Sequence, residues 1–309
     1  MSRPAHHGAW PVMLTPFTTR DEVDFETVDR YVDWLIDEGS TGLFPVALSG
    51  EMFQLSEPER LAVAARVVRR AAGRVPVAAA IAEHGTPAAT AEAASRLAEA
   101  GVDVVVLIAS VVLHEGDDES VFVEVARAVL DANPGVTFGV YECPLPYHRL
   151  LSDELLEWIA ATGRFSFLKE TSHDTAVMAT RVRIGSSAGL QIFNAGIEDH
   201  VDSLAVGVAG LSGWVVNVAP DLVAELGDIV ARDGATARAR ELQDLLAQVE
   251  DRMGPTYPGS AKAIVEARAG VGFTTRSRWR PSDVDVADAR AIAELLDAAA
   301  QAARSGARS

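Results

Sequence analysis

The feature that most constrains this chain is an alternation, repeated eight times, of short apolar runs with longer amphipathic segments. The runs are rich in β-branched residues and apolar nearly throughout, which is typical of strands in a sheet covered on both faces. Strands that alternate with helices predict a parallel sheet surrounded by those helices. The expected strands span residues 10–14, 42–46, 76–81, 103–108, 136–141, 165–169, 190–194 and 209–213.

The amphipathic segments are long enough to form helices, and several carry signals for where a helix starts. Ser56 and Glu59, for example, have the spacing of a capping box, with Pro58 in the first turn. Eight strand–helix units over roughly 225 residues match a closed (β/α)8 TIM barrel in size. The expected helices span residues 24–37, 56–71, 87–100, 119–131, 152–160, 174–183, 198–205 and 220–232.

After residue 232 the strand-like runs stop, and only helical periodicity continues. Three helices are expected there, over residues 235–252, 260–270 and 282–303, with prolines in the connections. The sequence therefore predicts a catalytic barrel over residues 1–232 and a C-terminal three-helix extension over residues 233–309.

The charge balance argues against two classes of partner. The 309 residues include 27 Lys plus Arg and 44 Asp plus Glu, a formal net charge of -17. Such a chain repels phosphate backbones and anionic lipids, so neither nucleic acid nor a membrane is an expected partner. The single cysteine, Cys143, fits a reducing cytoplasm, and no Cys/His cluster has metal-ligand spacing, so no metal is expected.

In a barrel of this kind the active site lies at the carboxyl ends of the strands. The sixth apolar run ends in Lys169, a residue type that is seldom buried. Desolvation lowers a lysine pKa toward neutrality and makes the amine a nucleophile, which suggests a covalent role. The alternative is an ion pair between Lys169 and a neighbouring carboxylate at a solvated strand end.

The fifth run ends in Tyr141, next to Glu142, Cys143 and Pro144. A phenol beside a reactive amine can relay a proton between the substrate and the carbinolamine formed on the lysine. The alternative is a core tyrosine with a satisfied hydroxyl group. Cys143 is interpreted as a small buried filler residue.

Motifs in matching order along nearly the whole chain resemble the dihydrodipicolinate synthase and N-acetylneuraminate lyase family of class I, Schiff-base aldolases. The order and spacing of these motifs together are more specific than any one of them. The motifs are Thr15-Pro16-Phe17, Gly50-Glu51, Arg74-Val75-Pro76-Val77, Tyr141 to Pro144, Leu168-Lys169-Glu170 and the stretch from Gly207 to Pro220.

This resemblance implies a role for each matched residue. Lys169 would be the Schiff-base lysine and Tyr141 the proton relay, with no cofactor beyond the lysine and a small 2-oxo acid as substrate. The loop at residues 47–51 would bind the substrate carboxylate, which agrees with the anion affinity of a hydroxyl and successive N–H groups beside a glycine. The family also implies a homo-oligomer, a dimer or a tetramer. The substrate-binding positions would be Leu48, Ser49, Gly50, Gly196, Glu198, Asp199 and Ser212.

Glu198 and Asp199 match the acidic pair with which sugar-acid lyases of the family hold hydroxyl groups. The alternative is that both residues are a helix N-terminal acidic cluster favoured by the helix dipole. Five further residues at the predicted mouth loops receive no role: Glu83, His84, His114, Arg149 and His173.

Three departures from the family pattern argue against a true dihydrodipicolinate synthase. Leu48 stands where the family has a threonine, and residues 109–112 replace the paired tyrosines after strand four. Residues 145–149 lack the Gly-Arg-Thr that follows the proline in the synthase. The proton relay that needs a threonine and a second tyrosine is therefore broken, and the arginine that would hold the aldehyde substrate is displaced or absent.

The sequence thus predicts a Schiff-base-forming lyase, aldolase or dehydratase, that acts on pyruvate or on a hydroxylated 2-oxo acid. An alternative is a catalytically impaired barrel that binds and senses a 2-oxo acid, which Leu48 and the missing tyrosine would explain. A third possibility is a pyridoxal-phosphate barrel, which would need a phosphate-binding nest after strands seven and eight.

Overall fold

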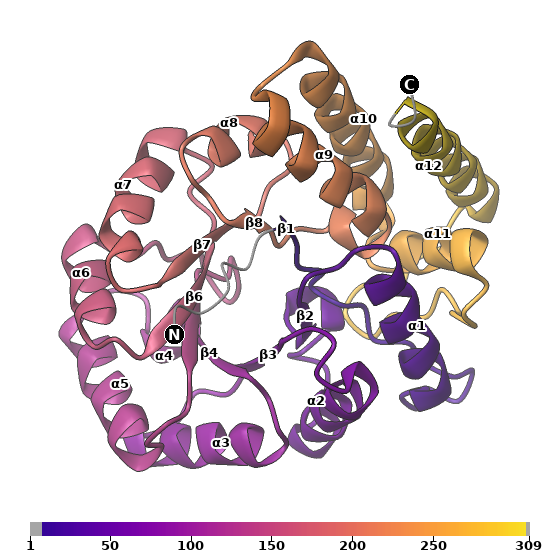
Figure 1. Ribbon diagram of the computed structural model, residues 1–309. Helices are drawn as coiled ribbons and strands as arrows, with labels where there is room; N and C mark the ends of the chain where they lie inside the picture. Colours follow the sequence, from indigo (N-terminus) through magenta and orange to yellow (C-terminus); the bar gives the residue numbers. More distant parts are fainter. Residues whose placement is uncertain (1–7, 307–309) are drawn as a thin grey trace.

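The computed structural model describes residues 8–306 and confirms the expected TIM barrel (Figure 1). Eight parallel strands pair in the order β1-β8-β7-β6-β5-β4-β3-β2. The ring is completed where Thr41 N–H donates to the Ala9 carbonyl at 2.9 Å and Phe44 N–H donates to the Pro11 carbonyl at 3.0 Å. The strands are β1 (Gly8–Ala9), β2 (Leu43–Val46), β3 (Val77–Ile81), β4 (Val104–Ile108), β5 (Phe138–Tyr141), β6 (Phe165–Glu170), β7 (Gln191–Asn194) and β8 (Gly210–Leu211).

Amphipathic helices surround these strands, with their apolar sides toward the sheet (Figure 1). The predicted capping box is present: Ser56 accepts from Glu59 N–H, and Glu59 accepts from Ser56 N–H. Among residues 8–306, no helix combines the length and apolarity that a bilayer crossing needs. The ring consists of α1 (Phe25–Asp37), α2 (Glu57–Ala71), α3 (Pro87–Glu99), α5 (Ser120–Ala132), α6 (Asp153–Ala161), α7 (Thr175–Ser186), α8 (His200–Ala205) and α9 (Pro220–Asp233).

The ends of the sheet differ from the sequence prediction. Strand β1 lies at Gly8–Ala9 rather than at residues 10–14, which run between their neighbours with scattered hydrogen bonds. Strand β8 is only two residues long, and its first position needs a glycine, because a Cβ atom at Gly210 would lie 2.1 Å from the Gly8 carbonyl oxygen. The short helix α4 (Ala109–Val112) after β4 was not expected from the sequence.

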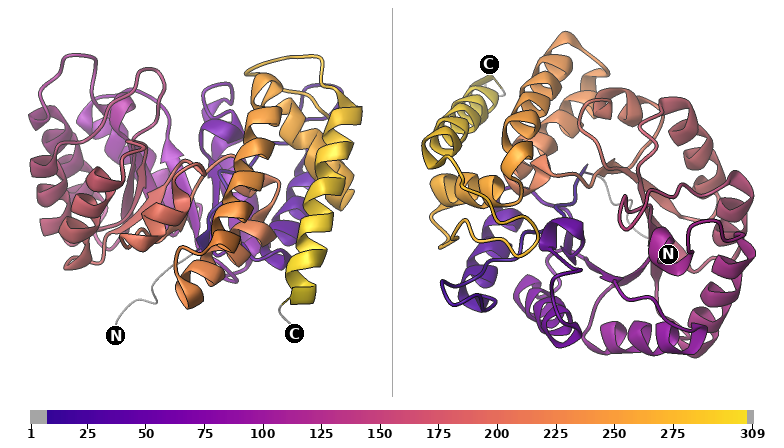
Figure 2. Two further views of the ribbon diagram at one scale, coloured as in Figure 1. Left: turned by 90° about the horizontal axis from the view of Figure 1, so that it is seen from above. Right: turned by 180° about the vertical axis from the view of Figure 1, so that it is seen from behind.

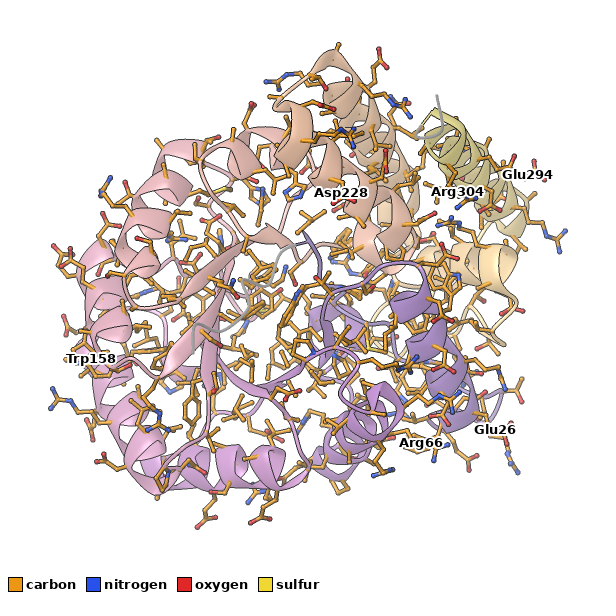
Figure 3. All side chains as sticks on the ribbon, in the orientation of Figure 1. Glu26, Arg66, Trp158, Asp228, Glu294 and Arg304 are labelled. Atoms are coloured by element: carbon orange, nitrogen blue, oxygen red, sulfur yellow. The ribbon has the colours of Figure 1, made fainter. Side chains whose placement is uncertain are left out.

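The barrel interior is filled by aromatic side chains. Trp10 stacks on Phe167 with ring centroids 5.1 Å apart, and its ring lies 5.0 Å from that of Phe193. Phe44 meets Phe167 edge-on at 5.9 Å. These rings form an apolar floor, whereas charged side chains such as Glu26, Arg66 and Glu294 lie on the outside of the molecule (Figure 3). Any group that projects inward above the floor is therefore desolvated.

The C-terminal extension packs on one side of the barrel, beside α9 and α1 (Figures 1 and 2). It consists of α10 (Ala237–Met253), α11 (Gly259–Ala269) and α12 (Val286–Gly306), with α10 against α8 and α9, and α12 against α11 and α9. Helix α12 begins at Val286 rather than at residue 282 as expected. The division of the chain at residue 232 stays a prediction.

Candidate active site

Lys169 and Tyr141 lie side by side where β5 and β6 end. Their Cα atoms are register partners, and the lysine Nζ atom lies 5.0 Å from the centroid of the tyrosine ring. Because side chains alternate along a strand, Lys169 shares the face of Phe167 and projects into the barrel above the aromatic floor. Its ammonium group donates to the backbone carbonyl of Ser212, just beyond β8.

The environment of Lys169 shifts its protonation equilibrium toward the neutral amine. The side chain is 4% exposed, and burial lowers its pKa to about 8, against the smaller opposing effects of Cys143, Glu250 and Glu170. Within residues 8–304, no carboxylate oxygen lies within 4.0 Å of its Nζ atom. The ion pair considered from the sequence is thus absent from this environment. With a pKa of about 8, about one tenth of the Lys169 side chains are free amine at pH 7.

The Tyr141 hydroxyl lies beside the Cys143 thiol. Burial is the largest cause that raises the pKa of Tyr141 well above its usual value, and Cys143 adds to the effect. The Ser110 hydroxyl donates to the carbonyls of Cys143 at 3.1 Å and Leu145 at 2.7 Å, which fixes the loop that follows Tyr141. Tyr141 can therefore hold and pass a proton as a neutral phenol, but it does not persist as an anion at ordinary pH.

A buried ionic cluster lies directly behind the two strand ends. Glu142 follows Tyr141, Glu170 follows Lys169, and Arg181 of α7 donates to both carboxylates, at 2.7 Å and 2.6 Å. All three side chains are almost fully buried. Burial raises the pKa of Glu142, with a smaller contribution in the same direction from Glu170, and Arg181 opposes the shift without cancelling it. The cluster ties the ends of β5 and β6 together and so fixes the distance between Tyr141 and Lys169.

The loop expected to bind a carboxylate forms a single 3-10 turn, Leu48–Gly50, after β2. Gly50 is required there, because a Cβ atom would lie 2.3 Å from the Pro45 carbonyl oxygen. The buried Ser49 hydroxyl lies beside the Tyr257 phenol, without a full hydrogen bond to it. Leu48 is 6% exposed and packs into the core.

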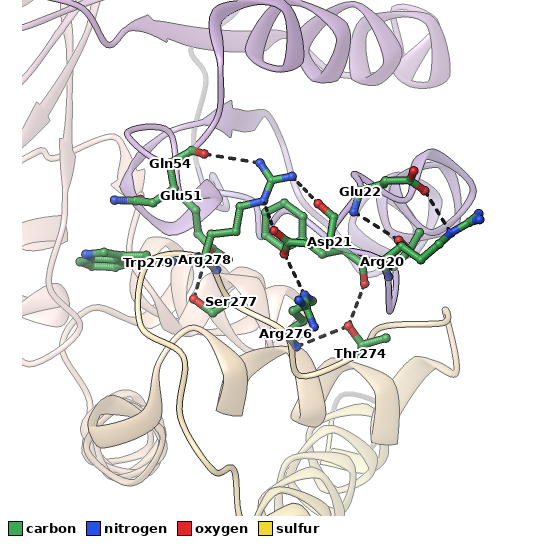
Figure 4. A network of polar contacts seen from close by, with 12 residues as sticks. Arg20, Asp21, Glu22, Glu51, Gln54, Thr274, Arg276, Ser277, Arg278 and Trp279 are labelled. Carbon is green, nitrogen blue, oxygen red and sulfur yellow. Dashed lines mark hydrogen bonds and ion pairs between the residues drawn. The ribbon is translucent and has the colours of Figure 1, made fainter.

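Glu51, at the end of this loop, anchors the barrel to the extension. Its carboxylate accepts from Lys262 Nζ at 2.6 Å and from Ser277 Oγ at 3.0 Å. It also accepts from the N–H groups of Arg278 at 2.6 Å and Trp279 at 2.9 Å. Figure 4 shows this junction, where the segment of the extension around residues 274–279 crosses the loop. The position of the 47–51 loop therefore depends on the extension.

The acidic pair after β7 lies directly before helix α8, as the alternative of a helix N-terminal cluster expected, but forms no capping hydrogen bond. Helix α8 begins at His200, and Asp199 makes no side-chain cap; its Oδ1 atom instead accepts from Asn194 Nδ2 at 2.7 Å. Glu198 is exposed, with an oxygen near Gly196. A Cβ atom at Gly196 would also meet the His173 ring at 2.6 Å, so glycine is needed there. Gly196, Glu198 and His173 thus meet at the barrel mouth.

Ser212 stands just beyond β8, opposite Lys169. Its N–H donates to the Asn194 carbonyl at 2.7 Å, and its carbonyl accepts from Lys169. Its buried hydroxyl has no hydrogen-bond partner within the described residues. A buried polar atom without a partner next to the amine is a natural contact for a bound ligand.

Two residues of the extension reach this region and were missed in the sequence. Tyr257 stacks on Trp214 with ring centroids 4.3 Å apart, and its hydroxyl accepts from Asn217 Nδ2 at 3.0 Å. Glu250 of α10 accepts from the Val215 N–H at 3.3 Å. Helical periodicity gave no sign of either contact, because it does not report which distant element a residue meets.

The residues left without a role lie elsewhere on the mouth loops. His84 and His114 are exposed and stack on each other at 4.9 Å, and Glu83 pairs with Arg60. Arg149 makes a local contact, in which its guanidinium donates to the Asp117 carbonyl at 3.1 Å. Across the described residues, no three His, Cys, Asp or Glu side chains gather in a way that could hold a metal ion.

Comparison with known proteins places this geometry in context. The family model described as the dihydrodipicolinate synthetase family matches residues 5–288. An uncharacterized DapA-like lyase of Halobacterium salinarum is 30% identical over 282 residues, covering 90% of each chain. A 4-hydroxy-tetrahydrodipicolinate synthase of Saccharophagus degradans is 28% identical over 249 residues, covering 80% of this chain and 82% of the relative.

Solved structures share the fold. The dihydrodipicolinate synthase DapA-2 of Bacillus anthracis superposes with a TM-score of 0.83 at 20% identity, over 94% of this chain and 97% of that one. YagE of Escherichia coli K12, a member of the dihydrodipicolinic acid synthase family solved in complex with pyruvate, gives 0.82 at 22% identity over 94% and 98%.

Proposed function

Because the chain belongs to the dihydrodipicolinate synthetase family, we propose that it is a lyase whose Lys169 forms a Schiff base with a 2-oxo acid. The observation that carries the proposal is the buried Lys169 amine, which has no ion pair among the described residues and a pKa of about 8, beside the phenol of Tyr141. Such an amine attacks a keto group, and the protonated imine then withdraws electrons from the bond to be broken or formed.

The neighbouring groups supply the remaining parts of the reaction. The Ser49 and Ser212 hydroxyls, with the backbone at Gly50, bind the carboxylate of the 2-oxo acid, and Tyr141 relays protons. The lysine imine provides the electron sink, so the reaction needs neither a metal nor a further cofactor. Pyruvate is the simplest acid that meets these requirements, and YagE binds it in a barrel of the same fold.

The far side of the site suits a hydroxylated substrate better than a second carboxylate. Glu198 and Asp199 follow β7 at the barrel mouth, and carboxylates accept hydrogen bonds from hydroxyl groups but repel anions. Leu48 removes a hydroxyl from the proton relay, which costs about 1 to 3 kcal/mol, or about one to two orders of magnitude in rate. We therefore assign the protein to a lyase or dehydratase of hydroxylated 2-oxo acids rather than to dihydrodipicolinate synthesis.

The test is a comparison of substrates on purified protein. Pyruvate plus aspartate semialdehyde is assayed against a panel of 2-keto-3-deoxy sugar acids and their dehydration products. The proposal predicts turnover of at least one sugar acid and negligible synthase activity. Efficient synthase turnover with no sugar-acid activity would overturn the substrate assignment, whereas binding without turnover of any acid would favour a sensing barrel.

Assembly and location complete the proposal. We assign the protein to the cytoplasm, in keeping with one buried cysteine, and to a homo-oligomer, a dimer or a tetramer. Neither nucleic acid nor a membrane is assigned as a partner, since the net charge of -17 repels both phosphate backbones and anionic lipids. Size-exclusion chromatography with light scattering measures the assembly directly.

A further inference from the structure

A polar cavity lies between the C-terminal extension and the loop before α1. Its volume is about 770 Å³, and its lining consists mainly of serine and threonine side chains, two arginines, Asp21 and Gln54. The lining includes neither Lys169 nor any of the predicted substrate-binding positions. The cavity is therefore separate from the candidate active site.

The positive charge of the cavity comes from an extended basic segment. Arg276, Arg278 and Arg280 stand at alternate positions in a stretch without helix or strand, in a chain whose net charge is -17. Figure 4 shows Arg276 and Arg278 directed toward Asp21, which accepts from Arg276 Nε at 2.8 Å. This bond uses one edge of the guanidinium, and the Arg276 side chain is 45% exposed. Its two terminal NH2 groups can therefore hold an anion as a fork.

Two lining side chains each have a buried atom that makes no hydrogen bond within the described residues. One is the acceptor Gln54 Oε1, and the other is the donor Arg278 Nε, which lies 3.4 Å from Asp21 Oδ2. The other nitrogens of Arg278 are bonded to Glu59 and to backbone carbonyls. Buried polar atoms are nearly always bonded in folded proteins. An open donor and an open acceptor together fit a ligand with hydroxyl groups, which both donate and accept.

We propose that this cavity binds a small acid that carries several hydroxyl groups, at a site distinct from the one that holds Lys169. The carboxylate of the acid pairs with the terminal NH2 groups of Arg276. Its hydroxyl groups meet the serine and threonine side chains and Gln54. A neutral polyol lacks the charge that the arginine recognises, and an anion without hydroxyl groups leaves the rest of the lining open.

The cavity is connected to the 47–51 loop through two of its lining residues. Ser277 Oγ donates to the Glu51 carboxylate at 3.0 Å, and Arg278 N–H donates to it at 2.6 Å. The Ser277 hydroxyl has one proton, so a ligand that accepts this proton withdraws it from Glu51. Occupancy of the cavity thus weakens the binding of the 2-oxo acid, a consequence that rests on the proposed function of this loop.

Isothermal titration calorimetry with D-gluconate tests the site, and sorbitol and acetate are probes that each lack one of its two features. Arg276→Gln removes the charged fork. Arg240→Gln is the matched control, because Arg240 pairs with Asp202 and is 48% exposed. Gluconate should bind the unmodified protein and Arg240→Gln equally, and Arg276→Gln about ten-fold more weakly. No binding of gluconate, equal binding to Arg276→Gln, or equally tight binding of sorbitol or acetate would overturn the site.

Cyanoborohydride trapping of pyruvate, followed by peptide mapping, tests the connection to the loop. Saturating gluconate should raise the pyruvate concentration for half-maximal trapping at Lys169 by about five-fold in the unmodified protein and in Arg240→Gln. No such rise is expected in Arg276→Gln. Trapping at Lys169 that gluconate leaves unchanged would overturn the connection. Failure to trap Lys169 at all would overturn the proposed function, whereas the calorimetry decides the site independently.

Discussion

Lys169 at the barrel mouth and Lys262 at the junction with the extension are the two lysines of the chain, and both are buried. Lys262 donates to Glu51 at 2.6 Å and to the Arg276 carbonyl at 2.5 Å. Lys169 donates to a backbone carbonyl and has no carboxylate within 4.0 Å among the described residues. Burial lowers the pKa of both, but Glu51 opposes that effect at Lys262. The partner, rather than the burial, separates a structural ammonium from a reactive amine.

The Arg181 cluster offers a third arrangement, in which one cation serves two carboxylates, Glu142 and Glu170. At Lys262 the charges balance, and N–H donors complete the shell of Glu51. At Arg181 one negative charge is left over, so the cluster can take up a proton. We therefore expect the stabilisation from the Lys262 cluster to be the same at any ordinary pH, and that from the Arg181 cluster to change with pH.

The largest expected effect separates the two lysines by stability. Lys262→Met leaves the Glu51 carboxylate buried without its cation and should lower the free energy of unfolding by about 3 to 5 kcal/mol. Lys169→Met removes a buried amine that has a backbone carbonyl but no carboxylate within 4.0 Å among the described residues, and its free energy of unfolding should stay within about 1 kcal/mol of that of the unmodified protein, or exceed it. Urea unfolding of both variants measures the difference. Equal destabilisation by the two substitutions would contradict the comparison.

A smaller and pH-dependent effect is expected at Arg181. Burial raises the pKa of Glu142 above its usual value of 4.5. The stability that protonated Glu142 contributes is therefore full below pH 4.5 and is lost as the pH rises through the pKa of the folded state. Arg181→Met removes the group that opposes this shift. This substitution should lower the free energy of unfolding by about 3 kcal/mol near pH 8 and by less near pH 5.

Urea unfolding at both pH values checks this expectation, and Arg66→Met serves as a control. Arg66 pairs with Asp29 on the outside of the barrel, and its loss should cost under about 1 kcal/mol at either pH. A cost at Arg181 that does not change with pH would show that the cluster holds no proton.

The smallest expected effect is a difference in acylation between the lysines. Trace acetic anhydride labels free amines, so labelling of Lys169 should rise about ten-fold from about pH 7 to about pH 9, with a midpoint near 8. Lys262, which is bonded to Glu51, should be labelled far less at each pH. Peptide mapping by mass spectrometry quantifies both sites. Similar labelling of the two lysines would remove the distinction between them.

The sequence predicted the barrel because apolar strands and amphipathic helices alternate with little interruption, and each helix of the ring lies close to its expected position. The predicted bounds of β1 and β8 were wrong, because an apolar run does not reveal where the hydrogen bonds between strands begin and end. Helix α4 was missed because four residues are too few to show a helical period in the sequence.

For the site, Tyr141 and Lys169 could be found because a polar residue that ends an apolar strand is conspicuous. Glu250 and Tyr257 could not, since a glutamate in an amphipathic helix looks like a surface charge and a tyrosine between prolines looks like a loop residue. Both acquire their place through the packing of α10 and the following turn on the barrel. Glu51 was assigned to the substrate loop, yet its carboxylate faces Lys262 and the extension.

The central claim is tested most directly by borohydride reduction in the presence of pyruvate, followed by intact mass and peptide mapping. With two lysines in the chain, the location of the adduct is decisive. We expect one reduced pyruvate imine per chain on Lys169, none on Lys262, and no adduct at all in Lys169→Ala. An adduct on Lys262 or the N-terminal amine instead, or none with pyruvate and every other 2-oxo acid tried, would contradict the account.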